Sequence, residues 1–84
     1  MPTLTESQGI RYVMNLWGKE HNPPHIHAIS DDFVAPFSIA TGEIMDGYFP
    51  ARGKRLVKEY IEFYRKELEE IWETGNYHRL PPLK

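Results

Sequence analysis

Hydrophobic residues at every second position mark the first half of the chain as strand-forming. Residues 10–17 alternate in this way, which is typical of a strand that buries one face. Further extended stretches follow at about 25–30, 33–40 and 43–49. Asp31-Asp32 and Thr41-Gly42 separate these stretches, and both pairs suit two-residue hairpin turns. The pattern therefore predicts a four-stranded antiparallel β-meander.

The two turns also predict how the strands pair. Pairing around residues 31 and 32 sets Ala28 opposite Ala35, and pairing around residues 41 and 42 sets Ile39 opposite Ile44. The predicted core face carries Ile26, Ala28, Phe33, Ala35, Phe37, Ile39, Ile44 and Tyr48. The other face carries His25, His27, Ile29, Val34, Ser38 and Met45. Pro36 falls inside a strand with two neighbours in this scheme, and because proline has no N–H we expect a bulge or a broken ladder there.

From Pro50 onward the hydrophobic period changes to 3.6, which predicts one amphipathic helix over about 50–74. Its apolar stripe consists of Leu56, Val57, Tyr60, Ile61, Tyr64, Leu68, Ile71 and Trp72, with Gly53 in the middle. Pro50 suits a first helical turn, and Gly75-Asn76 suits a helix end. The segment 77–84 contains Pro81-Pro82 and is expected to lie extended along the body. The fold class is therefore α+β, with one long C-terminal helix packed on one face of the meander.

Length and composition narrow the classes of protein. A chain of 84 residues is short, so we expect one domain over 1–84 with a thin core and no deep cavity. The net charge of -2 provides no general attraction for nucleic acid, so any phosphate contact needs a local patch. The absence of cysteine excludes disulfides, Cys-ligated metals and a thiol nucleophile. Without a signal sequence or an apolar span, a cytoplasmic location is expected.

Three of the four histidines lie within His21-Asn-Pro-Pro-His25-Ile-His27. Strand alternation places His25 and His27 on one face, and the Pro-Pro turn can bring His21 back towards them. Three imidazoles can hold a divalent metal such as zinc, and His21, His25 and His27 are the candidate ligands. Without a metal, His25 and His27 are candidate catalytic residues for general acid–base chemistry. The third interpretation is that they are surface histidines that bond the loop or a partner.

The charges of the helix run against its dipole. Arg52, Lys54, Arg55 and Lys58 lie near the start, and Glu67, Glu69, Glu70 and Glu73 lie near the end. The four cations are candidates for binding an anion or an acidic partner surface. The alternative is a solvated helix face with ordinary i,i+4 ion pairs.

Several segments, taken in order, resemble the family catalogued as domain of unknown function 4160, a set of small prokaryotic proteins. They are His21-Asn-Pro-Pro-His25-Ile-His27-Ala28, Ser38-Ile39 with Thr41-Gly42-Glu43, Arg55-Leu56-Val57, Trp72 and the closing Pro-Leu. The resemblance implies a small α+β domain. Because such genes often neighbour another small gene, it also implies one component of a toxin-antitoxin-like pair, and it implies no reaction.

We therefore expect a small cytosolic interaction protein that binds its partner through the sheet face left open by the helix. The expected partner is a small protein encoded by a neighbouring gene, with RNA and a second copy of the chain as open alternatives and no membrane. The alternative function is a histidine-dependent enzyme, either RNase-like or a metal-dependent hydrolase, that uses His21, His25 and His27.

Overall fold

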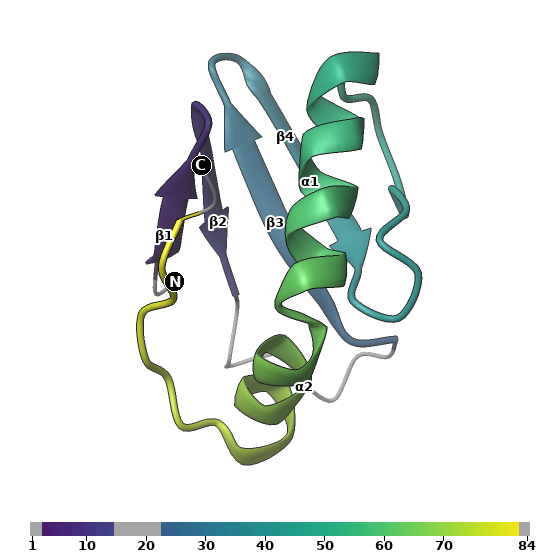
Figure 1. Cartoon of the computed structure of the whole chain (residues 1–84). Helices are drawn as coiled ribbons and strands as arrows, with labels where there is room; N and C mark the ends of the chain where they lie inside the picture. The colour runs from purple at the N-terminus through teal and green to yellow at the C-terminus, as the bar shows by residue number, and fades with distance from the viewer. Residues whose placement is uncertain (1–2, 15–22, 83–84) are drawn as a thin grey trace.

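A computed structural model describes residues 3–14 and 23–82. Its strands are β1 (Thr3–Ser7), β2 (Ile10–Val13), β3 (His25–Ser30) and β4 (Phe33–Ser38), and they form one antiparallel sheet in the order β1-β2-β3-β4. Two helices follow, α1 (Ala51–Phe63) and α2 (Arg65–Thr74), and both lie on the same side of the sheet (Figure 1). The α+β class and the four-stranded antiparallel sheet are confirmed.

The hairpin of β3 and β4 has the predicted register. Ala28 pairs with Ala35, and the ladder continues without a shift to the turn at residues 31 and 32. Asp31 adopts a positive φ of 51°, which aspartate tolerates better than most residues because its short side chain can bond the local backbone.

The first predicted strand, 10–17, begins at Ile10 as expected but is shorter than predicted, and residues 15–17 lie outside the described part of the chain. Within the described residues β2 ends at Val13, and an unpredicted strand, β1, precedes it. Gln8 and Gly9, with φ of 55° and 82°, form the tight turn between them. The β1 segment contains a single aliphatic residue, Leu4, so its pattern alone does not resemble a strand. Pairing with β2 stabilises this segment as a strand, although its residue pattern does not favour one.

The predicted strand at 43–49 is wrong. Strand β4 already ends at Ser38, and the following segment makes only an isolated bridge in which Ile44 lies opposite Phe37 rather than Ile39. The last strand of the sheet is therefore β4, which lies at an edge.

Pro36 explains why the outer pairing stops. The Met45 N–H donates to the Pro36 carbonyl at 2.9 Å, so the backbone of Pro36 faces outwards, away from β3. A regular ladder would need a return bond from residue 36 to residue 45, and proline has no N–H to donate. The expected broken ladder is thus on the outer side of Pro36, while the ladder between β3 and β4 stays intact.

The single long helix is also corrected, because it breaks at Tyr64, whose φ and ψ are -109° and 23°. A straight helix over 51–74 would be about 36 Å long at 1.5 Å per residue, whereas the longest extent of the protein is 31 Å. The break lets α2 turn below α1 (Figure 1), so that its apolar residues stay on the core. Those buried residues are Leu68, Ile71 and Trp72. The predicted helix end at Gly75 is confirmed by its left-handed conformation.

The core lies between the helices and the covered face of the sheet. At its centre the rings of Tyr12 and Tyr60 stack with centroids 4.4 Å apart. Gly53 also faces the core. A Cβ at this position would lie only 2.6 Å from the buried Phe49 ring. Tyr48 was wrongly assigned to the core, since it is 68% exposed; its ring lies beside that of Phe33, at a centroid distance of 5.6 Å.

The C-terminal segment passes beside β1 (Figure 1). The Leu80 N–H donates to the Leu4 carbonyl at 3.1 Å, and the Tyr60 hydroxyl donates to the Pro81 carbonyl at 3.1 Å. Burial of the Leu80 side chain adds apolar contact to these hydrogen bonds. The outer edge of β1 is therefore occupied by the protein's own chain.

Candidate functional site

The face of the sheet turned away from α1 is the candidate site, and we call it the open face; at its His25 end it meets Trp72 of α2. Its cross-strand rows are Arg11, Ile29 and Val34; Val13, His27 and Pro36; and His25 with Ser38. Val34 is 58% exposed and Ile29 is half-buried. Met45, 39% exposed, lies beside Pro36 through its backbone hydrogen bond. The structure thus brings Ile29, Val34 and Pro36 and the two histidines of β3 onto one surface, on which Val13 is buried.

The two histidines of the open face contact each other. The ring centroids of His25 and His27 lie 5.3 Å apart in an edge-to-face arrangement, and His25 also lies 5.4 Å from the Trp72 ring. His25 Nδ1 is 3.1 Å from the Pro23 carbonyl oxygen. Since a carbonyl oxygen only accepts hydrogen bonds, Nδ1 of His25 carries the proton. In the neutral ring the lone pair is therefore on Nε2.

His27 has a different environment. Its Nδ1 atom is buried and has no hydrogen-bond partner in the described part of the chain. Burial lowers the pKa of His27, and the nearby His25 lowers it further. A buried N–H without an acceptor is costly, so the neutral tautomer with the proton on Nε2 is favoured. With these tautomers, the pair offers an Nε2 acceptor on His25 and an Nε2 donor on His27.

Two of the three histidines of the predicted metal site belong to the described residues. His21 lies outside the described residues, while His25 and His27 lie together as expected. Within residues 3–14 and 23–82, no group of three or more His, Cys, Asp or Glu side chains is arranged to hold an ion. The described residues therefore contribute two candidate ligands.

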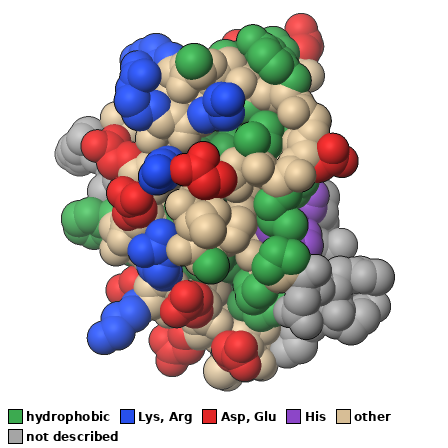
Figure 2. All heavy atoms as spheres, turned by 90° about the vertical axis from the view of Figure 1, so that its right-hand side faces the viewer, with side chains coloured by type: hydrophobic (Ala, Val, Ile, Leu, Met, Phe, Trp, Pro, Cys, Tyr) green, Lys and Arg blue, Asp and Glu red, His purple; other side chains and the backbone are tan. Residues whose placement is uncertain are grey.

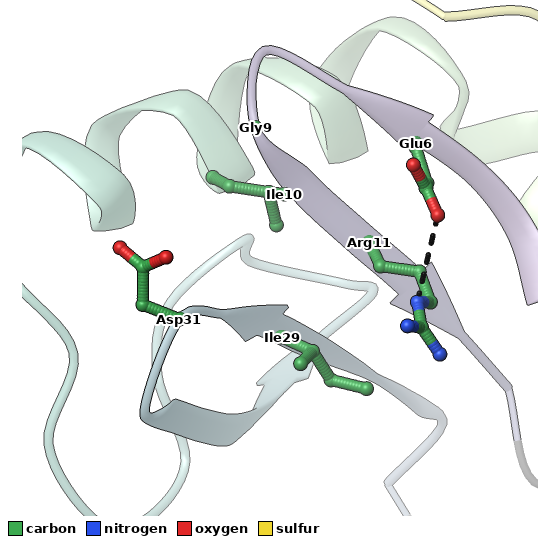
Figure 3. Close-up of a pocket in the computed structure, with 6 residues that line it drawn as sticks. All are labelled: Glu6, Gly9, Ile10, Arg11, Ile29 and Asp31. Carbon is green, nitrogen blue, oxygen red and sulfur yellow. Dashed lines mark ion pairs between the residues drawn. The ribbon is translucent and has the colours of Figure 1, made fainter.

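A shallow hollow of about 270 Å³ lies at the turn end of the open face (Figure 3). It is lined by Glu6, Gly9, Ile10, Arg11, Ile29 and Asp31. Figure 3 shows Glu6 and Arg11 directed towards each other from neighbouring strands, with an Nε–Oε2 distance of 3.6 Å. Sequence reasoning missed this hollow because it depends on the unpredicted β1. The Gln8-Gly9 pair before the first apolar run indicates a turn, and this turn was the sequence feature that could have predicted a strand before it.

The four predicted cations of α1 do not act as one group. Lys54, Arg55 and Lys58 line a second hollow, of about 250 Å³, whereas Arg52 does not. Lys58 Nζ donates to Glu43 Oε2 at 2.8 Å. This bond and its charge lower the pKa of Glu43 and raise the pKa of Lys58. Figure 2 shows Lys and Arg side chains from the upper left to the lower left of this view, with Asp and Glu side chains among them, and histidines at the right-hand margin.

A family model for small domains matches residues 9–73, which is well over half of the chain. The chain belongs to the family described as Domain of unknown function (DUF4160). The DUF4160 match covers β2, β3, β4 and α1 entirely, and it leaves β1 and the C-terminal segment outside. No curated protein and no solved structure matches the chain. The function must therefore be argued from the geometry.

Proposed function

We propose that this protein binds a partner protein through the open face, as one cytoplasmic component of a toxin-antitoxin-like gene pair. The observation that carries the proposal is the half-exposed apolar centre of that face, formed by Ile29, Val34 and Pro36, over which no described helix lies. The Glu6–Arg11 pair flanks this centre at one end and the histidines flank it at the other. An apolar centre with a polar rim is the usual anatomy of a protein interface.

The edges of the sheet support binding through the face. A partner strand could add to a sheet only at a free edge. The edge of β1 bonds the C-terminal segment through Leu4 and Leu80, and the edge of β4 bonds residues 43–45 through Ser38 and Pro36. Because the chain's own segments bond part of each edge, less backbone is left for strand addition, which favours binding through the open face.

The charge of the open face favours a protein over RNA. Glu6 and Arg11 offset each other there, so the face lacks the basic groove that tracks a phosphate backbone. Neither helix in the described residues is both long and apolar enough to cross a bilayer. A small protein encoded by a neighbouring gene is therefore the proposed partner, and a second copy of the chain is the competing outcome.

Val34→Asp tests this proposal. Val34 is 58% exposed, so a carboxylate there leaves folding intact while placing a charge in the centre of the face. Phe63→Asp, at a residue that is 67% exposed on α1, is the matched control. In co-purification with the neighbouring gene product we expect Val34→Asp to abolish capture and Phe63→Asp to retain it.

Sedimentation of the same proteins separates the two kinds of partner. A dimer that Val34→Asp dissociates, without capture of the neighbouring product, would assign the face to self-association. A strict monomer that also captures no neighbouring product would refute the proposal. Loss of capture in both variants would place the interface elsewhere.

A histidine-dependent enzyme is the second candidate, and the His25–Pro23 hydrogen bond favours it. This bond leaves the His25 Nε2 lone pair free to take a proton, while the His27 Nε2–H can donate one. Such a pair suits RNase-like acid–base catalysis, or metal-dependent hydrolysis if a divalent ion such as zinc is bound by His25, His27 and His21.

Replacing both His25 and His27 by Ala distinguishes the candidates. An enzyme should lose activity or toxicity and keep its fold, whereas an interface should lose partner binding. His78→Ala is the control, because His78 is exposed and lies outside the pair. For the metal variant of the proposal, zinc at pH 7.5 should raise the midpoint of thermal unfolding by mass action. An unchanged midpoint, or an equal NMR response of His78, would refute metal binding.

A further inference from the structure

A second hollow, the basic pocket, lies between α1 and the segment that follows β4, and the proposed function does not use it. It encloses about 250 Å³ and is lined by Phe37, Gly42, Glu43, Ile44, Lys54, Arg55 and Lys58. These residues are distinct from those of the open face. The basic pocket is therefore available whether or not a partner occupies that face.

The backbone builds this pocket at Gly42. Gly42 is buried with φ of 76°, and a Cβ there would lie 2.9 Å from Lys58 Cγ and 3.4 Å from Lys58 Cα. Glycine thus allows the turn to approach α1 more closely than any other residue could. The approach places Glu43 against Lys58 and positions the Ile44 side chain beside the same helix face.

The charges in the basic pocket do not balance. Lys54, Arg55 and Lys58 contribute three cations, and in the described residues Glu43 is the carboxylate among the lining groups. Glu43 bonds Lys58 and its charge also interacts with Lys54, so the lining keeps an excess of two positive charges. This excess is local, since the whole chain carries a net charge of -2. Cations near a helix start also oppose the helix dipole, so local helix stability does not explain them.

The magnitude of the excess indicates the type of anion. A single carboxylate would offset half of this excess, whereas a phosphate monoester carries about -1.5 to -2 at pH 7 and offsets most or all of it. The planar guanidinium of Arg55 suits bidentate contact with phosphate oxygens, and Lys54 can act as a point charge beside it. The half-buried Ile44 adds an apolar wall for the body that carries the phosphate.

We propose that the basic pocket binds a small organic phosphate monoester of nucleoside monophosphate size, with Arg55 and Lys54 on the phosphate and Ile44 against its apolar body. The volume of about 250 Å³ holds a phosphate and part of one such body, which favours a small ligand over a polymer.

NMR titration of the full chain tests this site with adenosine 5′-monophosphate, inorganic phosphate and adenosine as probes. The amides of Gly42, Glu43 and residues 54–58 should shift saturably with both phosphate compounds and not with adenosine. The nucleotide should bind more tightly than inorganic phosphate because only it reaches Ile44. Sodium chloride at equal ionic strength should not reproduce the shifts.

Matched variants decide between a site and general attraction. Lys54→Gln with Arg55→Gln should weaken binding by about tenfold or more, because each removes a charge-assisted hydrogen bond. Both side chains are exposed, so the fold is retained. Arg52→Gln removes the same charge from the same turn of α1 but outside the pocket, and it should leave affinity within about twofold.

Three outcomes would overturn the assignment. One is an equal loss of affinity in Arg52→Gln, which would indicate unspecific attraction to the helix start. Another is a shift that chloride reproduces or that does not saturate. The third is equal affinity for inorganic phosphate and the nucleotide, which would remove the apolar body from the proposal.

Discussion

The two faces of the sheet use alternate residues of the same strands for different purposes. In β3, Ile26 and Ala28 point to the helices and are fully buried, while His25, His27 and Ile29 on the other face are half-buried. The covered face packs rings and aliphatic groups tightly, whereas the open face contains a histidine nitrogen without a hydrogen-bond partner in the described residues. The comparison teaches that burial on the covered face stabilises the fold. The open face can therefore contain residues, such as the two histidines, that contribute little to stability.

Truncation of a buried helix residue should give the largest effect. Leu68→Ala or Ile61→Ala should lower the free energy of unfolding by about 2–5 kcal/mol, because both side chains are fully buried and leave a cavity. Val34→Ala on the open face should cost less than about 0.5 kcal/mol. Chemical denaturation measures both. Similar losses at Leu68 and Val34 would break the distinction between the faces.

Gly53→Ala should destabilise the protein although alanine favours helix. The new Cβ would lie 2.6 Å from the Phe49 ring, which is 1% exposed and contacts Phe37 at a centroid distance of 5.5 Å. Overpacking of this kind costs about 1–3 kcal/mol, more than the ~1 kcal/mol gained in helix propensity. A stabilised Gly53→Ala variant in the same denaturation assay would show that Phe49 is free to move.

Alkaline pH should weaken the covered face. Burial raises the pKa of Tyr12, and the charges of Tyr60 and Glu59 raise it further above the ordinary value of 10.0. The folded state then favours the neutral phenol, so this contribution is complete below pH 10 and is lost as pH rises above it. Tyr12 alone should contribute at most about 1.4 kcal/mol per pH unit to the slope, and Tyr12→Phe should remove that contribution. An unchanged slope in Tyr12→Phe would contradict this origin.

Lowering the pH should reduce the stability of the protein through His27 on the open face, and this is the smallest of the predicted effects. The pKa of His27 is lowered from 6.5 by burial and by His25, so the unfolded chain takes up the proton more readily. This contribution is complete above pH 6.5 and is lost as pH falls below it. Unfolding measured at pH 7.5 and pH 5.5 should show a smaller difference for His27→Gln than for the original protein. An equal difference would remove His27 as the source.

Local patterns predicted the elements that local physics determines. The hairpin of β3 and β4 follows from apolar alternation on both sides of Asp31-Asp32, and the apolar stripe from Val57 to Trp72 follows from the helical period. The pairing of His25 and His27 on one face follows from strand alternation. These features need no knowledge of distant contacts.

Features that depend on a partner elsewhere in the chain were missed or misplaced. Strand β1 is a strand because β2 and the segment containing Leu80 pair with it on both sides. The basic pocket required the turn at Gly42 to meet Lys58, sixteen residues further on, and nothing near either residue indicates that contact. Arg52 was grouped with the lining cations because it lies within one helical turn of Arg55, and only the tertiary structure shows that the hollow does not reach it.

The sequence by itself determined the class of fold, the β3–β4 register and the amphipathic stripe, because each depends on periodicity and on short-range backbone preference. Tertiary structure decided which strand lies at the edge, and therefore why Pro36 is tolerated and why residues 43–49 do not continue the sheet. It also decided the break at Tyr64, since a straight helix would extend beyond a body 31 Å long. Edge position and available length are properties of the assembled chain, and no local window of residues contains them.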